Sequence, residues 1–460
     1  MSGTDDGAVS PRLPTTQPVN RSRWARVDLA AMRIELLALA ALLVLLVAVT
    51  ALHVRAYQRL SPIDELHHVD YLLKAADGQL LRRGDVIGPE TRREGACRGV
   101  DAPGYPASCD DESWLDGREF NTEEIQPPGY YFLTAWTARA LRPVLGTSSL
   151  VAAGRMVGAL WTAAGVMALW AALRMLGTSL TVRWVVSALV ITTPVVLHAS
   201  TTVTNDATGI LAGGAVLLAA LAWERHRVPA LVVILITAGA VSLRLTNFVG
   251  AGMVVLYLVI RALRRGEDPD EPAARSSRSH LVMAAGITAT VVVTGVAWVA
   301  LNSVVARVGP LENPNTFNQQ VSGVSLDTVL GESGATVPPT HDPYLVPFLR
   351  NNAIRTVVRA TDWLLLGATI GLAALARRAS PGEALGASAI ASAVATGPLL
   401  TVTNYVFQGA YYVIPPRYGL SLVPAFAVAL GLSMQKTWVR AAVASVAGAS
   451  VVLTLAAEVR

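Results

Sequence analysis

Long apolar runs separated by short charged segments dominate this chain. At a rise of 1.5 Å per residue, a helix of about 20 residues crosses a hydrocarbon core of about 30 Å. The apolar runs near this length are 32–54, 129–146, 150–173, 183–200, 207–223, 228–243, 247–263, 281–305, 357–376, 384–407, 415–433 and 440–457. A membrane β-barrel would show short alternating segments instead. The pattern predicts an all-α polytopic membrane protein.

Composition and charge agree with this prediction. Of 460 residues, 53% are hydrophobic and only 15% are charged, whereas soluble domains carry roughly 25% charge. The net charge is +5, but the arginines are spread over short loops, as the positive-inside rule describes for cytoplasmic loops. We therefore expect membrane lipids, and no nucleic acid, as partners.

Charge also predicts how the chain crosses the membrane. The polar N-terminal segment 1–31 is expected to be disordered and cytoplasmic, followed by a retained anchor and not a cleaved signal peptide. The loop 261–280, the pair Arg377-Arg378 and the segment 224–227 are basic and should also be cytoplasmic. These sides are consistent only if one of the twelve runs does not span the membrane.

The run that fits least well as a span is 129–146. Pro127 and Pro128 break the chain before it, and Tyr130 and Tyr131 suit a membrane interface. We predict that it lies on the outer face, which leaves about eleven spans with the N-terminus inside and the C-terminus outside. Residues 32–460 then form a single transmembrane domain with outer loops at about 55–149 and 306–356.

Under this topology, polar residues gather at the outer face. Asp64, Glu65 and His67 follow the first helix, Asn205 and Asp206 end a later one, and Arg244 and Arg417 lie in outer turns. Ionisable groups at membrane depth are costly and usually functional.

Structural interpretations of the same residues stay open. Asp64 and Asp206 are also suited to a role as helix N-caps. The side chain of Arg417 could equally extend to the lipid headgroups. Arg244 is equally compatible with an ordinary loop charge. His67, His68 and Asp70 are more typical of a solvated helix edge.

Carboxylates and arginines on one membrane face suit the chemistry of a lipid-linked donor. A carboxylate removes the proton of an acceptor hydroxyl, and a guanidinium fork binds the oxygens of the leaving phosphate. The sequence contains no Gly-rich loop of the kind that binds nucleotide phosphates.

Short motifs resemble the GT-C superfamily of integral membrane glycosyltransferases, in particular the polyprenyl-phosphate-mannose protein mannosyltransferases and the lipid A aminoarabinose transferases. The motifs are Asp64-Glu65 with His67, Gln126-Pro127-Pro128 with Tyr130-Tyr131, Asn205-Asp206, and Pro416-Arg417-Tyr418. The resemblance implies a GT-C-like fold with interfacial helices in the first outer loop. It also implies that Asp64 is the base, Glu65 a second acidic group and Arg417 a phosphate contact, with Arg244 a further candidate. The chain departs from the pattern at Gln126, where a His is usual, and in its second outer loop, which lacks a soluble domain.

The two cysteines, Cys97 and Cys109, lie in the same polar loop. A metal site would need further ligands nearby, so an extracytoplasmic loop favours a disulfide. The sequence pattern requires no cofactor. It leaves open whether the site uses a divalent cation, and it assigns no metal ligands.

The sequence thus predicts an enzyme of the cell membrane that transfers a sugar from a polyprenyl-phosphate donor to a cell-envelope acceptor hydroxyl at the outer face. Two alternatives stay open, namely a transporter or flippase of a lipid-linked sugar and a non-catalytic envelope-assembly subunit. A transporter would place polar groups near the bilayer midplane, often in two repeated halves. The identities of the sugar and the acceptor are not encoded in any motif.

Overall fold

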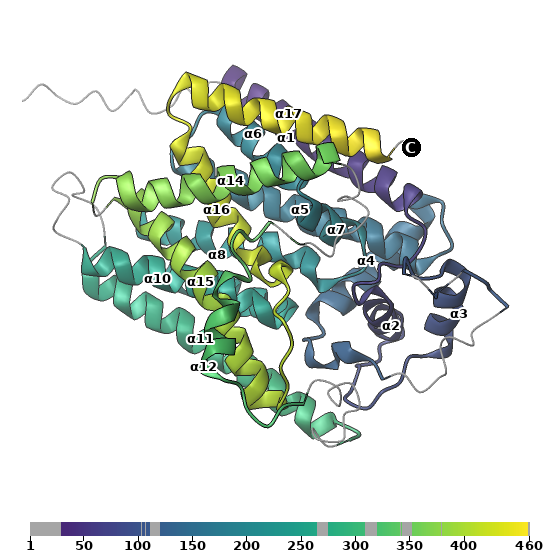
Figure 1. The fold of residues 1–460 in the computed structure, drawn as a ribbon. Helices are drawn as coiled ribbons and strands as arrows, with labels where there is room; N and C mark the ends of the chain where they lie inside the picture. The colour runs from purple at the N-terminus through teal and green to yellow at the C-terminus, as the bar shows by residue number, and fades with distance from the viewer. Residues whose placement is uncertain are drawn as a thin grey trace, which may run out of the picture.

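The described part of the protein is a bundle of helices (Figure 1). The computed structural model describes residues 29–102, 104–105, 107–110, 120–264, 275–308, 320–340, 342, 352–378 and 380–458. Within these ranges extended segments pair only at isolated bridges, such as Leu60 with Val100. The predicted disordered segment 1–31 lies almost entirely outside them, and the first helix already begins at Leu29.

The helices follow the predicted apolar runs closely. Their bounds are α1 Leu29–Ala56, α2 Glu65–Ala76, α3 Pro89–Arg98, α4 Gly129–Leu145, α5 Leu150–Met175, α6 Leu180–Ile191, α7 Pro194–Thr201, α8 Gly209–Glu224, α9 Ala230–Leu243, α10 Phe248–Leu263, α11 Ser277–Val305, α12 Leu326–Gly331, α14 Asn352–Leu375, α15 Pro381–Gln408, α16 Val423–Ser433 and α17 Thr437–Glu458. Short 3₁₀ turns are η2 Thr122–Ile125, η3 Asn205–Thr208, η4 Leu245–Asn247, η7 Glu332–Gly334 and η8 Pro416–Leu422.

Among the described residues, eight helices are long and apolar enough to cross a membrane, or nine if α6 and α7 form one bent span. The chain is therefore a multi-pass membrane protein, as predicted. The predicted spans 228–243 and 415–433 correspond to shorter elements, because α9 has 14 residues and α16 has 11. The total of eleven spans stays a prediction, as does the interfacial position of 129–146, which is the 17-residue helix α4.

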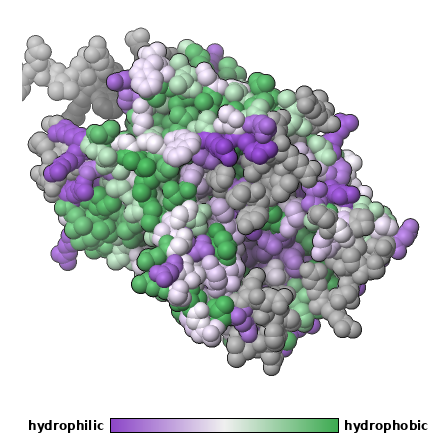
Figure 2. All heavy atoms as spheres, viewed as in Figure 1, coloured by the Kyte–Doolittle hydropathy of each residue, from purple (hydrophilic) through white to green (hydrophobic). Residues whose placement is uncertain are grey.

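Central and peripheral helices differ in how much of their surface is covered. In an 18-residue stretch of the segment Asn205–Glu224, which contains α8, 83% of the residues are buried, whereas in the corresponding stretches of α1, α11 and α17 only 22% are buried. Apolar side chains such as Leu37, Val293 and Val452 are exposed on these outer helices. Figure 2 shows hydrophobic residues over much of the visible surface of the helical bundle. Such a face suits lipid, because hydrocarbon does not penalise exposed apolar groups.

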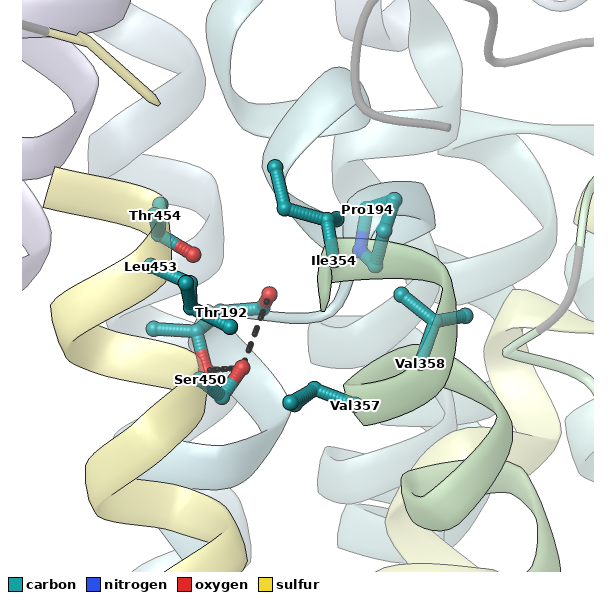
Figure 3. A pocket seen from close by; sticks show the side chains of 8 residues that line it. All are labelled: Thr192, Pro194, Ile354, Val357, Val358, Ser450, Leu453 and Thr454. Atoms are coloured by element: carbon teal, nitrogen blue, oxygen red, sulfur yellow. Dashed lines mark hydrogen bonds between the residues drawn. The ribbon is translucent and has the colours of Figure 1, made fainter. Parts of the chain in front are cut away.

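The bent span shows how polar groups at a break in a membrane helix find hydrogen-bond partners. The axes of α6 and α7 differ by 67°, and Pro194 follows the break, where it cannot donate a backbone hydrogen bond. Ser450 of α17 donates to the Thr192 hydroxyl at 2.8 Å and lies 3.5 Å from its carbonyl oxygen. Figure 3 shows these residues with Ile354 and Val358 of α14 around a small pocket. The neighbouring helix thus supplies the polar contact that lipid cannot.

The first predicted outer loop is a folded unit on one end of the bundle. Helices α2, α3 and α4 lie together there (Figure 1). Helices α2 and α4 contribute to a core that includes Tyr71, Leu81 and Tyr131, and α3 packs against α2. The rings of Tyr71 and Tyr131 stack with centroids 3.9 Å apart. In the structure Cys97 and Cys109 form a disulfide that ties the end of α3 to the following loop.

Two expectations for α2 are wrong. Asp70 is 1% exposed, not solvated, because its carboxylate accepts hydrogen bonds from Lys74, Thr91, Asn121 and the Gly88 backbone. His68 is also buried and lies between Tyr131 and Thr204. The polar face of α2 is therefore packed against its neighbours.

Candidate functional site

The site is centred on an acidic turn at the start of α2. Asp64 is the N-cap residue of α2, yet its side chain makes no capping hydrogen bond. Its backbone is left-handed, with φ of 57°, a conformation that is uncommon for residues other than glycine. The carboxylate is half exposed and accepts a 2.9 Å hydrogen bond from Nη2 of Arg417. The carboxylate therefore points to the bundle and not to its own helix.

Arg417 connects three acidic residues from distant parts of the chain. It lies at the start of η8, where Pro415 and Pro416 precede it. Its Nε lies 3.4 Å from Oδ2 of Asp206 and its Nη1 lies 4.0 Å from Oδ2 of Asp342. The side chain is 12% exposed. A buried cation of this kind requires compensating charge, which the carboxylates provide.

A second arginine completes the cluster. Arg244 forms an ion pair with Oδ1 of Asp206 and is 3% exposed. The guanidinium carbons of Arg244 and Arg417 lie 5.2 and 5.6 Å from the ring centroid of Tyr418. Cations at this distance are attracted to an aromatic face, so Tyr418 holds two like charges near one another.

The Asp206 turn does not rely on Asp206 as its cap. Thr204 is the N-cap of η3, and its hydroxyl accepts from the Asp206 backbone N–H at 3.2 Å. The carboxylate of Asp206 is left to face Arg244 and Arg417. The neighbouring Asn205 donates to the hydroxyl of Tyr131 at 3.4 Å.

Glu65 lies outside this cluster although it follows Asp64. It is fully buried and accepts from Nε and Nη2 of Arg155 at 2.8 and 2.7 Å. Burial alone would raise the pKa of Glu65, but Arg155 and the backbone N–H groups of Ser61 and Val203 bring it below its ordinary value. Its charge is therefore neutralised within the fold.

Glu123 is a residue of this region that sequence reasoning missed. It lies in η2, and its Oε2 accepts from the Tyr131 hydroxyl at 3.1 Å and lies 3.4 Å from Nδ1 of His68. Burial, with the negative charge of Asp64 added, raises the pKa of Glu123 to about 8. Its only sequence signal is its position three residues before Gln126-Pro127-Pro128.

The remaining predicted site residues are Tyr130, Gln126 and His67, which lie in α4, just before α4 and in α2. Tyr130 is fully buried and meets Tyr131 edge to face. Gln126 Oε1 is buried without a hydrogen-bond partner in the described residues. The ring of His67 lies 3.4 Å from the Thr122 backbone N–H. Of these residues, His67 links α2 to η2.

Figure 2 shows the surface hollowed beside α2, with hydrophilic residues in the hollow. Within the part of the chain that the structure describes, no group of three or more His, Cys, Asp or Glu residues is arranged to hold a metal ion. The charged groups that converge here are thus carboxylates and guanidinium groups.

Neither a protein-family model nor a curated protein sequence matches the chain. Among solved structures, the crystal structure of ArnT from Cupriavidus metallidurans bound to undecaprenyl phosphate is similar, with a TM-score of 0.46 and 16% identity over 87% of this chain and 60% of that chain. The same protein in the apo state gives a TM-score of 0.46 and 16% identity over 88% of this chain and 60% of that chain. The chain spans about 60% of the length of these structures.

Proposed function

We propose that this protein transfers a sugar from a polyprenyl-phosphate donor to a cell-envelope acceptor hydroxyl at the outer face of the membrane. The observation that carries the proposal is the meeting of Asp64, Asp206, Arg244 and Arg417. They come from four separate segments and converge at one end of an apolar bundle. A purely structural ion cluster would not need a half-exposed carboxylate held in a left-handed turn.

The two arginines are the proposed phosphate contacts. A guanidinium presents planar N–H pairs that match phosphate oxygens, and Arg244 and Arg417 flank the same tyrosine ring. Positive charge that is already in place stabilises the negative charge developing on the leaving phosphate. The apolar helices beside the cluster would hold the prenyl chain.

Asp64 is the proposed base. In the resting protein its carboxylate is paired with Arg417. A donor phosphate that binds Arg417 competes for the same N–H groups and releases Asp64. The acceptor oxygen then attacks the anomeric carbon, the bond from that carbon to the phosphate oxygen breaks with its electron pair leaving on the phosphate, and Asp64 takes the acceptor proton. The half-exposed carboxylate can pass the proton to water.

The test is turnover with a panel of polyprenyl-phosphate-linked sugars, measured as release of polyprenyl phosphate in detergent with envelope extracts as acceptor. Asp64→Asn keeps the size of the side chain but removes the basic oxygen, so transfer should fall on the order of 10²-fold or more. Asp77→Asn is the matched control, because Asp77 pairs with Arg139 on the exposed surface. Near-normal turnover in Asp64→Asn would contradict the mechanism.

Wild-type protein that moves the lipid-linked sugar across vesicle membranes without releasing polyprenyl phosphate would favour a transporter. This vesicle assay, run beside the detergent assay, therefore separates the proposal from its main alternative.

A further inference from the structure

We propose that Glu65 is a positioning residue, whose buried carboxylate clamps the Asp64 turn and the Asp206 turn to each other. The inference deepens the proposed function, and only its kinetic part rests on that function. Glu65 does not touch Arg417 or Arg244 in any described contact, so its role differs from that of Asp64.

The clamp has one arm on each acidic turn. Oε2 of Glu65 accepts from the Ser61 backbone N–H at 2.7 Å, three residues before Asp64. Oε1 accepts from the Val203 backbone N–H at 2.9 Å, three residues before Asp206. The two turns are far apart in the sequence, yet both must meet Arg417. One carboxylate therefore determines the separation of the two turns.

Arg155 anchors the clamp to the bundle. Besides its two bonds to Glu65, its guanidinium donates to the carbonyl oxygens of Tyr57 and Arg59 at 2.8 Å each. These carbonyls lie just after the end of α1, in the segment that leads to the Asp64 turn. Arg155 lies in the second turn of α5 and is 2% exposed. The end of α1, the start of α5 and both acidic turns thus meet at one buried ion pair.

The clamp also explains how Asp64 is held in its left-handed conformation. The hydroxyl of Ser61 accepts from the Ile63 backbone N–H at 3.2 Å and lies 2.9 Å from Nε2 of His198 on α7. Ser61 is therefore held by Glu65 through its N–H and by α7 through its hydroxyl. An uncommon backbone conformation persists only where surrounding contacts over-determine it, and these contacts do so.

The test compares Glu65→Gln with Glu224→Gln. Glu224 is a matched control because it is also a buried carboxylate paired with an arginine, Arg261. It ends α8, roughly 24 Å along the helix from the Asp206 turn by helical rise. Both variants remove a buried charge, but only Glu65→Gln should disturb the site.

The first measurement is amide hydrogen exchange by mass spectrometry, which does not depend on activity. In Glu65→Gln, peptides covering 60–68 and 202–208 should both exchange at least tenfold faster. In Glu224→Gln neither should change. Faster exchange confined to 60–68 would overturn the clamp, since Val203 would then be held by something else.

The second measurement is a kinetic cycle with Asp64→Asn. Glu65→Gln should lower kcat at least tenfold in the wild-type background and less than threefold in the Asp64→Asn background, because a positioning residue acts through the base. Equal loss in both backgrounds would overturn the inference. If Glu65→Gln does not fold, Arg155→Lys weakens the same pair by removing the planar fork, and the same exchange and kinetic criteria apply. If the wild type transfers no sugar but Glu65→Gln still exchanges faster in both peptides, the proposed function is refuted while the clamp stands.

Discussion

The unusual pKa of Glu123 makes the stability of this protein depend on pH in a specific way. Its carboxyl titrates at about 8 in the folded protein, against a usual value of 4.5. Between these values the folded protein holds a proton that the unfolded chain has released. The free energy of unfolding contributed by this group is therefore fully present below about pH 4.5 and is lost as pH rises towards 8.

The size of the effect follows from the same two values. Each unit of difference corresponds to 1.36 kcal/mol, so the full loss is on the order of 5 kcal/mol. Little of it is screened, because the Glu123 side chain is only 12% exposed. Its surroundings also oppose ionisation, since Asp64 adds a negative charge and burial lowers the pKa of the neighbouring His68, which keeps that ring neutral.

Glu123→Gln should remove this pH dependence. The amide keeps an acceptor for the Tyr131 hydroxyl but does not ionise. We expect the free energy of unfolding in mixed detergent micelles, followed from pH 5 to pH 9, to fall steeply in the wild type and much less in the variant. Glu90→Gln is the control, because Glu90 is exposed on α3. If the wild type and Glu123→Gln show parallel curves, the assigned environment of Glu123 is wrong.

Three further outcomes are expected. Arg417→Gln should weaken binding of undecaprenyl phosphate at least tenfold by native mass spectrometry, while Arg139→Gln, an exposed control, should not; equal affinity would remove Arg417 from the phosphate site. Cys97→Ser should make the loop after α3 more sensitive to limited proteolysis, because in the chain-entropy account a disulfide that closes a loop of this size stabilises the folded state by roughly 3 kcal/mol. Unchanged cleavage would mean that packing alone holds the loop. Ser148→Cys should react with a membrane-impermeant thiol reagent added outside intact cells, because residue 148 lies outside if α4 is interfacial. Reaction only after the membrane is opened would mean that 129–146 spans the membrane.

Much of the architecture could be predicted from the sequence because membrane helices obey a local rule. A run such as 281–305 is recognisable without any tertiary information, and it is α11 in the structure. The candidate residues Asp64, Arg244 and Arg417 were recognisable for the same reason, since charge is conspicuous beside apolar runs. The sequence predicted that these residues lie near one another, and in the structure they form one cluster with Asp206.

The partners of each charge were decided by the tertiary structure. Asp64 and Glu65 are adjacent carboxylates with the same local signals, yet one faces Arg417 at the surface and the other is buried against Arg155. Asp70, predicted to be solvated, is enclosed by α3 and the segment before η2. Burial and pairing depend on segments that are distant in sequence, so a local pattern can show that a charge is unusual but not which group will neutralise it.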